Sequence, residues 1–213
     1  MRSGVLVLAK APVPGRVKTR LCPPCTPEQA ALIAAAAIAD TLDAVDATGA
    51  PAKTLVADGD LTPPPGWSAI AQCDGDLDVR LAHAFAATTV AGLPSILIGM
   101  DTPQITAGVL ADADAALDHA DAALGPAADG GWWTLALRDP RDAHVLRGIP
   151  TSRDDTGART LAALRSRGLK VALLPTMRDV DTVQDALAVA AGHPAGRFAA
   201  AVRDHVAIPA VAR

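Results

Sequence analysis

The sequence predicts an α/β protein in which helices cover both faces of a mostly parallel sheet, as a three-layer α/β/α sandwich. Two observations lead to this prediction. Short apolar runs such as 5–9 and 95–99 alternate with longer Ala/Leu-rich stretches of helical spacing, and the runs are nearly continuous, as in strands buried on both faces. The chain of 213 residues, half of them hydrophobic, has the size of one domain, and we expect a single domain over residues 1–213.

The individual elements follow from apolar runs and capping signals. Strands are expected over 5–9, 54–57, 68–72, 95–99, 122–124, 132–137 and 170–174. The segment Thr26–Gln29 has the pattern of a capping box with proline at the first helical position, which predicts a helix to Val45. Further helices are expected over 77–89, 106–119, 156–167 and 182–191, with Thr106 and Thr182 as caps. The Ala-rich tail after His193 is expected to be a loosely attached helix.

Composition argues against several classes of function. The formal net charge of -4 and the lack of a basic stripe argue against nucleic-acid binding. No apolar run approaches the roughly 18 residues of a membrane span, and no signal-peptide pattern is visible, so we expect a cytoplasmic protein. Three cysteines do not make a disulfide framework. The Cys22–Cys25 pair has the spacing of a redox or metal motif, but too few further ligands accompany it for a closed zinc site.

The predicted sheet points to the place where a ligand would bind. In a parallel sheet, ligands bind beyond the carboxyl ends of the strands. Polar residues that directly follow predicted strands are therefore the first candidates for a site. Four segments qualify: Lys10–Arg20, Asp101, Asp129–Gly131 and Asp179–Asp181.

The first of these segments concentrates positive charge on a stiff loop. Lysine occurs at only four positions in the chain, and Lys10 and Lys18 both lie here, beside Arg16 and Arg20. Prolines and Gly15 stiffen the loop, so its donors are held in place before an anion arrives, which favours a polyphosphate site. We assign Lys10, Gly15, Lys18 and Arg20 to nucleotide and phosphate binding. The loop is not a Walker A motif, because no glycine directly precedes the lysine. A solvated basic turn is the alternative interpretation.

Three aspartates offer matching oxygen ligands. Asp101 directly follows an apolar strand, and Thr106 is better spaced to cap the next helix, which leaves the Asp101 carboxylate free. Asp179 and Asp181 alternate at an expected strand end, so their side chains point the same way. Facing a basic loop, these carboxylates can hold Mg²⁺ or Mn²⁺ against a nucleotide diphosphate. Helix capping by Asp101 and an ordinary acidic helix N-terminus at Asp179 and Asp181 are the alternatives.

The loop after the fifth predicted strand combines an acid, two glycines and two tryptophans. Asp129 is a candidate base, or a residue that orients an acceptor. Gly130 and Gly131 permit positive φ values and close approach of the backbone to a ligand. Trp132 and Trp133 are each candidates either for core filling or for contact with a sugar or base. We assign Gly130, Gly131 and Trp132 to substrate binding.

These motifs, in this order, resemble the DUF2064 family of bacterial nucleotide-diphospho-sugar transferases, which have the Rossmann-like glycosyltransferase-A (GT-A) fold. The motifs that carry the resemblance span nearly the whole chain: Ala9–Leu21, Gly75–Leu77, Gly99–Pro103, Gly125–Trp132 and Asp179–Thr182.

The resemblance also implies roles for single residues. Similar motifs occur in the guanylyltransferases of coenzyme F420 synthesis, where the aspartates hold divalent ions. It therefore implies that Asp101, Asp179 and Asp181 are ligands of Mg²⁺ or Mn²⁺ and that Lys18 and Arg20 contact phosphate. This agrees with the strand-end argument.

Two segments depart from the family pattern. Asp78-Val79 stands where the family often has Gly-Glu, and Thr151–Arg153 stands where it often has Trp-Ser-Thr. Both lie toward the expected acceptor side, so the resemblance leaves the acceptor open.

The expected function is metal-dependent glycosyl transfer from a nucleoside diphosphate sugar to a small-molecule acceptor, with Asp101 and Asp129 in the catalytic set. The alternative is nucleotidylyl transfer from an NTP to a phosphorylated acid or sugar with release of pyrophosphate, because both reactions place charge on the same phosphates. A third hypothesis, motivated by the altered acceptor side, is a non-catalytic nucleotide-binding protein. The oligomeric state stays open.

Overall fold

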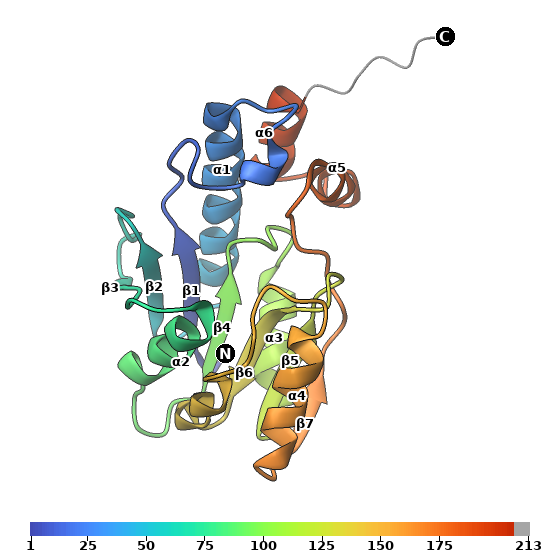
Figure 1. Cartoon of the computed structure of the whole chain (residues 1–213). Coiled ribbons are helices and arrows are strands. Elements are labelled where there is room, and N and C mark those ends of the chain that lie inside the picture. Colours follow the sequence, from blue (N-terminus) through green and yellow to red (C-terminus); the bar gives the residue numbers. More distant parts are fainter. Residues whose placement is uncertain (207–213) are drawn as a thin grey trace.

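A seven-stranded sheet forms the centre of the molecule in the computed structural model, which describes residues 1–206 (Figure 1). The strand order is β3-β2-β1-β4-β6-β5-β7, and of the described strands only β6 runs antiparallel to its neighbours. The strands are β1 (Gly4–Lys10), β2 (Lys53–Asp58), β3 (Ser68–Ala71), β4 (Ser95–Gly99), β5 (Ala122–Pro126), β6 (Trp132–Leu137) and β7 (Val171–Leu173). Each overlaps an expected strand, and the sheet confirms the predicted α/β class.

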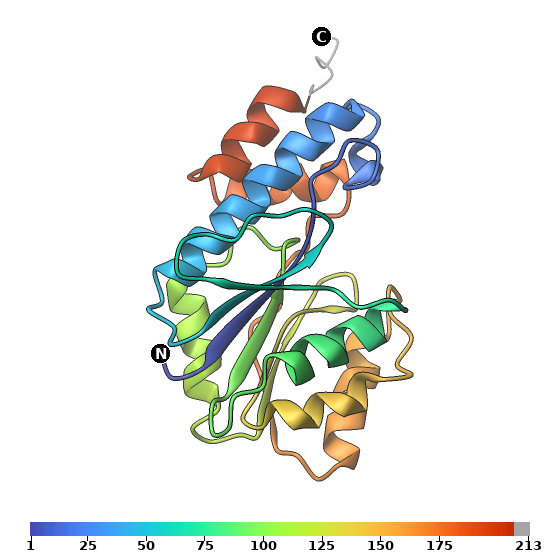
Figure 2. The same ribbon diagram turned by 90° about the vertical axis from the view of Figure 1, so that its left-hand side faces the viewer.

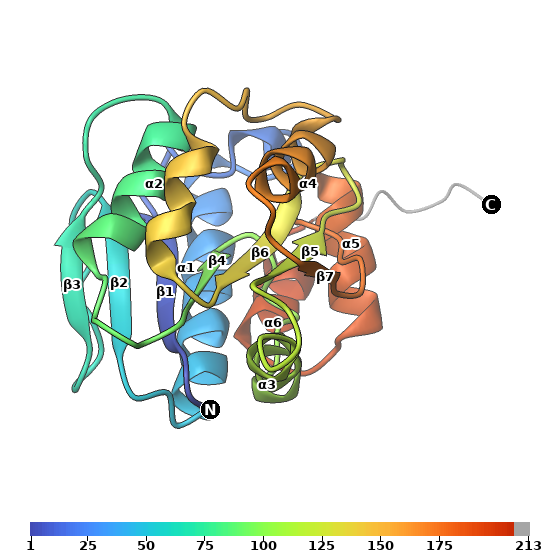
Figure 3. The same ribbon diagram turned by 90° about the horizontal axis from the view of Figure 1, so that it is seen from below.

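Helices cover both faces of this sheet (Figure 3). One face carries α1 (Pro27–Asp46) and α3 (Ala107–Ala116), and the other carries α2 (Leu77–Ala87), α4 (Thr156–Ser166) and the 3-10 helix η2 (Pro140–Leu146). The first loop holds a short 3-10 helix, η1 (Thr19–Leu21), while α5 (Val183–Gly192) and α6 (Arg197–His205) gather near one end of α1 (Figure 2). None of the described helices is long and apolar enough to cross a membrane.

The caps expected from the sequence form in the structure. Thr26 and Gln29 complete the capping box of α1, with the backbone N–H of Thr26 donating to Gln29 Oε1 at 2.8 Å. The hydroxyls of Thr106 and Thr182 accept backbone N–H groups at the starts of α3 and α5. Because Thr106 caps α3, Asp101 stays outside that helix and is available to the loop region.

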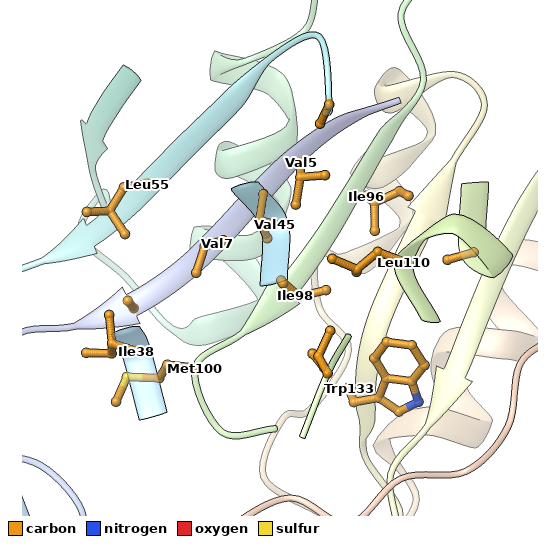
Figure 4. Packing of buried hydrophobic residues seen from close by; sticks show 14 of the residues in the cluster. Val5, Val7, Ile38, Val45, Leu55, Ile96, Ile98, Met100, Leu110 and Trp133 are labelled. Carbon is orange, nitrogen blue, oxygen red and sulfur yellow. The ribbon is translucent and has the colours of Figure 1, made fainter. Parts of the chain in front are cut away.

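Alternate side chains of the central strands enter two separate cores. Val5 and Val7 of β1 pack with Ile98 of β4 against α1 and α3 (Figure 4). Leu6 and Leu97 point to the opposite face and pack against α2 and η2. Since both faces of these central strands are covered, both sets of positions are apolar, which is why the sequence shows continuous runs there rather than alternation.

A third apolar cluster ties the first loop to the C-terminal helices. Leu21 and Cys25 pack with α1, α5 and α6, and Val180 joins them at 1% exposure. The Cys25 thiol donates to the carbonyl of His205 at 3.7 Å, and burial raises its pKa. This cysteine therefore has a packing role in the fold.

The helix after His193 differs from the expectation of a loosely attached tail. Phe198 and Val202 of α6 are buried in the third cluster, and the backbone N–H of Phe198 donates to Asp40 Oδ2 of α1 at 2.8 Å. These contacts fix α6 against α1. Residues 207–213 of the expected tail lie outside the described part of the chain, so a single domain over the whole chain stays a prediction.

Candidate active site

A cavity of about 550 Å³ opens at the carboxyl ends of β1 and β4 and at the loop after β5. Charged residues from five distant segments line it, together with Trp132 and an apolar set of leucines. The charged residues are Arg20, Asp101, Asp129, Arg153, Asp154, Asp179 and Asp181. The sheet edge selected from the sequence is therefore the edge at which these groups meet.

Lys18 connects the first loop to the acidic groups at this edge. Its Nζ donates to Asp101 Oδ1 and to the carbonyl of Val180. The Lys18 side chain is only 7% exposed, whereas that of Asp101 is 52% exposed, so the lysine is held and the carboxylate faces the cavity. Lys18 also has φ of 48°, a left-handed conformation that is strained for a non-glycine residue and that concentrates at functional sites.

Arg20 makes the second contact between the basic loop and the acids. It forms an ion pair with Asp181, and both side chains are more than half exposed. Exposed ion pairs of this kind contribute about 0 to 1 kcal/mol to the stability of the fold. Arg20 and Asp181 can therefore separate at little cost and bind a ligand instead. Arg20 and Asp181 both line the cavity.

Asp179 is the least satisfied carboxylate of the group. Its Oδ1 is buried and has no hydrogen-bond partner within residues 1–206. Burial, then the negative charges of Asp101, Asp129 and Asp181, raises the pKa of Asp179 to about 7, against the opposing effect of Lys18. A buried anion among like charges is costly unless a cation joins it, so this position fits an added positive charge.

The donor types at this edge suit a hard divalent cation, but the carboxylates are not gathered around a single point. As they stand, no three Asp, Glu, His or Cys side chains of residues 1–206 are grouped closely enough to hold a metal ion. Lys18 and Arg20 balance Asp101 and Asp181 instead. Carboxylate oxygens and the orphaned Oδ1 of Asp179 nevertheless fit the oxygen ligands that Mg²⁺ and Mn²⁺ prefer.

Asp179 and Asp181 do not follow a strand end, contrary to expectation. β7 ends at Leu173, and Pro175, which has no N–H to donate to a ladder, follows soon after. An irregular segment then leads back to the sheet edge, where the backbone N–H of Met177 donates to the carbonyl of Pro126 at 3.0 Å. Backbone pairing with the loop after β5, rather than a strand, brings the two acids to the cavity.

The turn at Gly130 is tight for a reason that the sequence did not indicate. Gly130 has φ of +90°, and a Cβ there would lie 1.9 Å from the carbonyl oxygen of Asp154. The backbone N–H of Gly157 donates to Gly130 O at 2.8 Å, and that of Gly131 donates to Asp129 Oδ1 at 2.9 Å. The close approach is thus to another loop of the chain, and it fixes Asp129 and Gly131 at the cavity.

Of the two tryptophans, Trp133 fills the core and Trp132 lines the cavity. Trp133 is 2% exposed, lies in the first core and donates from Nε1 to Pro175 O at 3.0 Å. Trp132 is half-buried and lines the cavity. Gly125 lies against the Trp133 ring, because a Cβ at this position would come within 2.3 Å of a ring carbon.

Lys10 and Gly15 lie apart from the cavity lining. Lys10 Nζ is 4.0 Å from Asp58 Oδ2 at the end of β2, and Gly15 is an exposed turn residue with φ of +74°. Of the four residues assigned to phosphate binding, only Lys18 and Arg20 contact the acidic group. The role of all four stays a prediction.

Other lining residues were not assigned a site role from the sequence, although Thr151–Arg153 was expected toward the acceptor side. Leu8, Leu77, Leu81 and Leu97 give the cavity an apolar side, and Thr151–Asp154 gives it a polar one. Leu8 and Leu97 could have been found from the strand alternation, because both point to the α2 face. Asp78, expected toward the acceptor, instead accepts the backbone N–H of Gly148 at 2.7 Å and supports the loop after η2.

Comparison with solved structures shows that the chain has the fold of nucleotide-diphospho-sugar transferases, which nucleotidyltransferases share. A "putative nucleotide-diphospho-sugar transferase" from Desulfovibrio desulfuricans G20 is 29% identical, with 95% of this chain and 94% of that chain covered and a TM-score of 0.85. The chain belongs to the DUF2064 family, described as an uncharacterized protein conserved in bacteria, whose profile matches residues 31–153.

More distant structures share the fold. A 2-C-methyl-D-erythritol 4-phosphate cytidylyltransferase from Thermus thermophilus is 16% identical, with 92% of this chain and 100% of that chain covered and a TM-score of 0.54. A manganese complex of Rv0371C from Mycobacterium tuberculosis H37Rv is 20% identical, with coverages of 88% and 96% and a TM-score of 0.54. No curated protein matches the chain significantly.

Proposed function

We propose that the chain is a metal-dependent transferase that moves a glycosyl group from a nucleoside diphosphate sugar to a small-molecule acceptor. The observation that carries this proposal is the meeting of Lys18 and Arg20 with the aspartates at the carboxyl edge of a mostly parallel sheet. The similarity to a nucleotide-diphospho-sugar transferase over nearly the whole chain supports it.

The basic loop would bind the diphosphate. Lys18 and Arg20 now donate to Asp101 and Asp181, and phosphate oxygens would replace these carboxylates as acceptors. The carboxylates released in this way, together with Asp179, would then hold Mg²⁺ or Mn²⁺. Such an ion, when bound, would neutralise the charge that develops on the leaving diphosphate. Mn²⁺ in the structure of the distant relative Rv0371C supports the choice of ion.

Asp129 and Trp132 would serve the acceptor. The Gly131 N–H fixes Asp129 through Oδ1, which leaves the other carboxylate oxygen to accept a proton or a hydrogen bond from an acceptor hydroxyl. Trp132 lines the same cavity and offers a flat apolar surface to a sugar ring. In this arrangement Asp101 supports the leaving group while Asp129 orients the attacking group.

Nucleotidylyl transfer is the second candidate, because the same cations and carboxylates would stabilise attack on the α-phosphate of an NTP. A cytidylyltransferase shares the fold of this chain, which supports nucleotidylyl transfer as a candidate. A nucleotide-binding protein without turnover is the third.

Product analysis separates the three candidates. The protein is incubated with Mg²⁺ or Mn²⁺, with UDP-, GDP- and dTDP-sugars or with NTPs, and with a panel of sugar and phosphorylated-acid acceptors. Glycosyl transfer predicts release of nucleoside diphosphate that EDTA abolishes. Pyrophosphate from an NTP would replace the leading proposal by the second candidate. Metal-dependent nucleotide binding in calorimetry with no product on either panel would leave the third.

A further inference from the structure

The segment Thr151–Asp154 lines the cavity in a fixed conformation. The Thr156 hydroxyl donates to Pro150 O at 2.9 Å and accepts the backbone N–H of Arg153 at 3.2 Å. Gly130 packs directly against the Asp154 backbone, so the loop has no room to shift toward it. The segment is therefore organised before any ligand binds.

Backbone strain is stored within this fixed segment. Ser152 has φ of 58°, a left-handed conformation that is strained for a non-glycine residue. Ser152 lines the cavity between Thr151 and Arg153, so the strained residue lies where a ligand would contact it. Local strain that the surrounding hydrogen bonds maintain is typical of binding sites.

Arg153 lines the cavity, and within residues 1–206 it forms no ion pair with a carboxylate that lines the cavity. The other lining cation, Arg20, is paired with Asp181. Arg153 donates instead from Nε to Asp155 Oδ1 at 3.2 Å, and Asp155 is not part of the lining. Within the described residues, the two Nη groups of the Arg153 guanidinium make no hydrogen bond to the protein.

The partner of Arg153 is also shared with a second arginine. Arg159 Nε donates to Asp155 Oδ2 at 2.7 Å, one helical turn along α4. Hydrogen bonding to Arg159, more than to Arg153, holds the pKa of Asp155 below its ordinary value. Arg153 and Arg159 together carry one positive charge more than Asp155, and Arg153 is the less tightly held of the two. The Asp154 carboxylate, which also lines the cavity, forms no ion pair with either arginine within the described residues.

We propose that Thr151–Arg153 is an anion subsite, in which the Arg153 guanidinium and the neighbouring hydroxyls of Thr151 and Ser152 bind a carboxylate or phosphate group of the acceptor. A guanidinium binds either oxyanion through two parallel N–H groups. The donor diphosphate is assigned to Lys18 and Arg20 on another segment, so the ligand of Arg153 is the second substrate. That assignment to the acceptor rests on the proposed function, whereas the binding of an anion does not.

Titration of the ¹⁵N-labelled protein with inorganic phosphate, and separately with acetate, tests the subsite. We expect chemical-shift changes at the amides of 151–156 and at the Trp132 indole. In Arg153→Gln the apparent Kd of these changes should rise about tenfold, as for loss of a charge-assisted bidentate contact, and Arg153→Lys should recover part of it. Arg159→Gln is the matched control, because Arg159 shares Asp155 but does not line the cavity, and it should change the Kd less than about twofold.

The two probes distinguish the sources of the anion. Arg153-dependent binding of phosphate alone indicates a phosphorylated acceptor, and binding of acetate alone indicates a carboxylic acid. Equal affinity in wild type and Arg153→Gln, or no shift at 151–156 with either probe, overturns the proposal. Thermal unfolding of each variant shows that the comparison is made on folded protein.

A separate nucleotide-binding experiment distinguishes a failure of this inference from a failure of the proposed function. Calorimetry with Mg²⁺ and nucleoside diphosphates is run on wild type and Arg153→Gln, which should bind nucleotide alike. Arg153-dependent anion binding in a protein that binds no nucleotide would remove the transferase proposal and keep the anion subsite. Nucleotide binding without Arg153-dependent anion binding would do the opposite.

Discussion

Two largely buried aspartates at opposite edges of the sheet are held in opposite ways. Asp114, at the amino edge, accepts the backbone N–H groups of Arg2 and Ser3, both at 2.9 Å, and the Ser3 hydroxyl at 2.5 Å. Burial alone would raise its pKa, but the hydrogen bonds from Ser3 and Arg2 together hold it below the ordinary value. Asp179, at the carboxyl edge, has an orphaned oxygen and a pKa raised to about 7.

The difference shows which edge the fold stabilises and which edge it leaves to a ligand. Asp114 is satisfied by the chain itself and fastens the start of β1 to α3, so it contributes to stability. Asp179 lies close to other carboxylates and keeps a buried oxygen for which the described residues supply no hydrogen bond, which is the pattern of a functional site.

The largest expected effect is on turnover. Asp101→Ala should lower kcat/KM of the metal-dependent reaction by about 100- to 1000-fold, because it removes a carboxylate beside the reacting phosphates. Asp118→Ala is the matched control, since Asp118 is paired with Arg2 at the amino edge, and its rate should equal that of wild type. Steady-state kinetics measure both; a normal rate in Asp101→Ala would remove Asp101 from the catalytic set.

The next effect is on stability at the amino edge. Asp114→Ala should lower the free energy of unfolding by about 2 to 3 kcal/mol, because it leaves the buried donors of Ser3 and the part-buried N–H of Arg2 without an acceptor. Urea unfolding measures the change, and Asp118→Ala should change it by less than about 1 kcal/mol. Equal losses in the two variants would contradict a special role for Asp114.

Asp179→Asn should change the stability in the opposite direction to Asp114→Ala. At pH 8 it should raise the free energy of unfolding of the metal-free protein by about 1 to 2 kcal/mol, because the amide relieves the burial of a charge among like charges. The wild type loses stability as pH rises from the ordinary carboxyl pKa through about 7, so the gain should shrink as pH falls from 8 and vanish below the ordinary carboxyl pKa of about 3.9. Added Mg²⁺ should stabilise wild type but not the variant; stabilisation of both would exclude Asp179 as a ligand.

The smallest effect is the pH dependence at Asp114. Its lowered folded pKa means that its contribution is present above the unfolded value of about 3.9 and is lost as pH falls through the folded pKa. The stability difference between wild type and Asp114→Asn should therefore shrink as pH falls from 6 to 3. Urea unfolding across this range would contradict the interpretation if the difference stayed constant.

The sequence was sufficient for the elements and for the edge of the sheet that holds the cavity. Val5, Leu6 and Val7 are apolar in succession because both faces of β1 are covered, and this local pattern survives without knowledge of the fold. The cap of Thr106 is equally local, since donor and acceptor lie within one helical turn. Such features depend on neighbours in the chain, so the chain predicts them.

The tertiary structure alone decided which side chains meet. Lys18 contacts Asp101 and Val180, and Gly130 packs against the backbone of Asp154. Arg153 comes to the cavity from a further segment. Each of these positions depends on segments that are separated in the sequence. No local periodicity encodes them, because they depend on how loops leave the sheet and return to it. The sequence determined the chemistry available at this edge, and packing determined which charges are neutralised and which are left for a ligand.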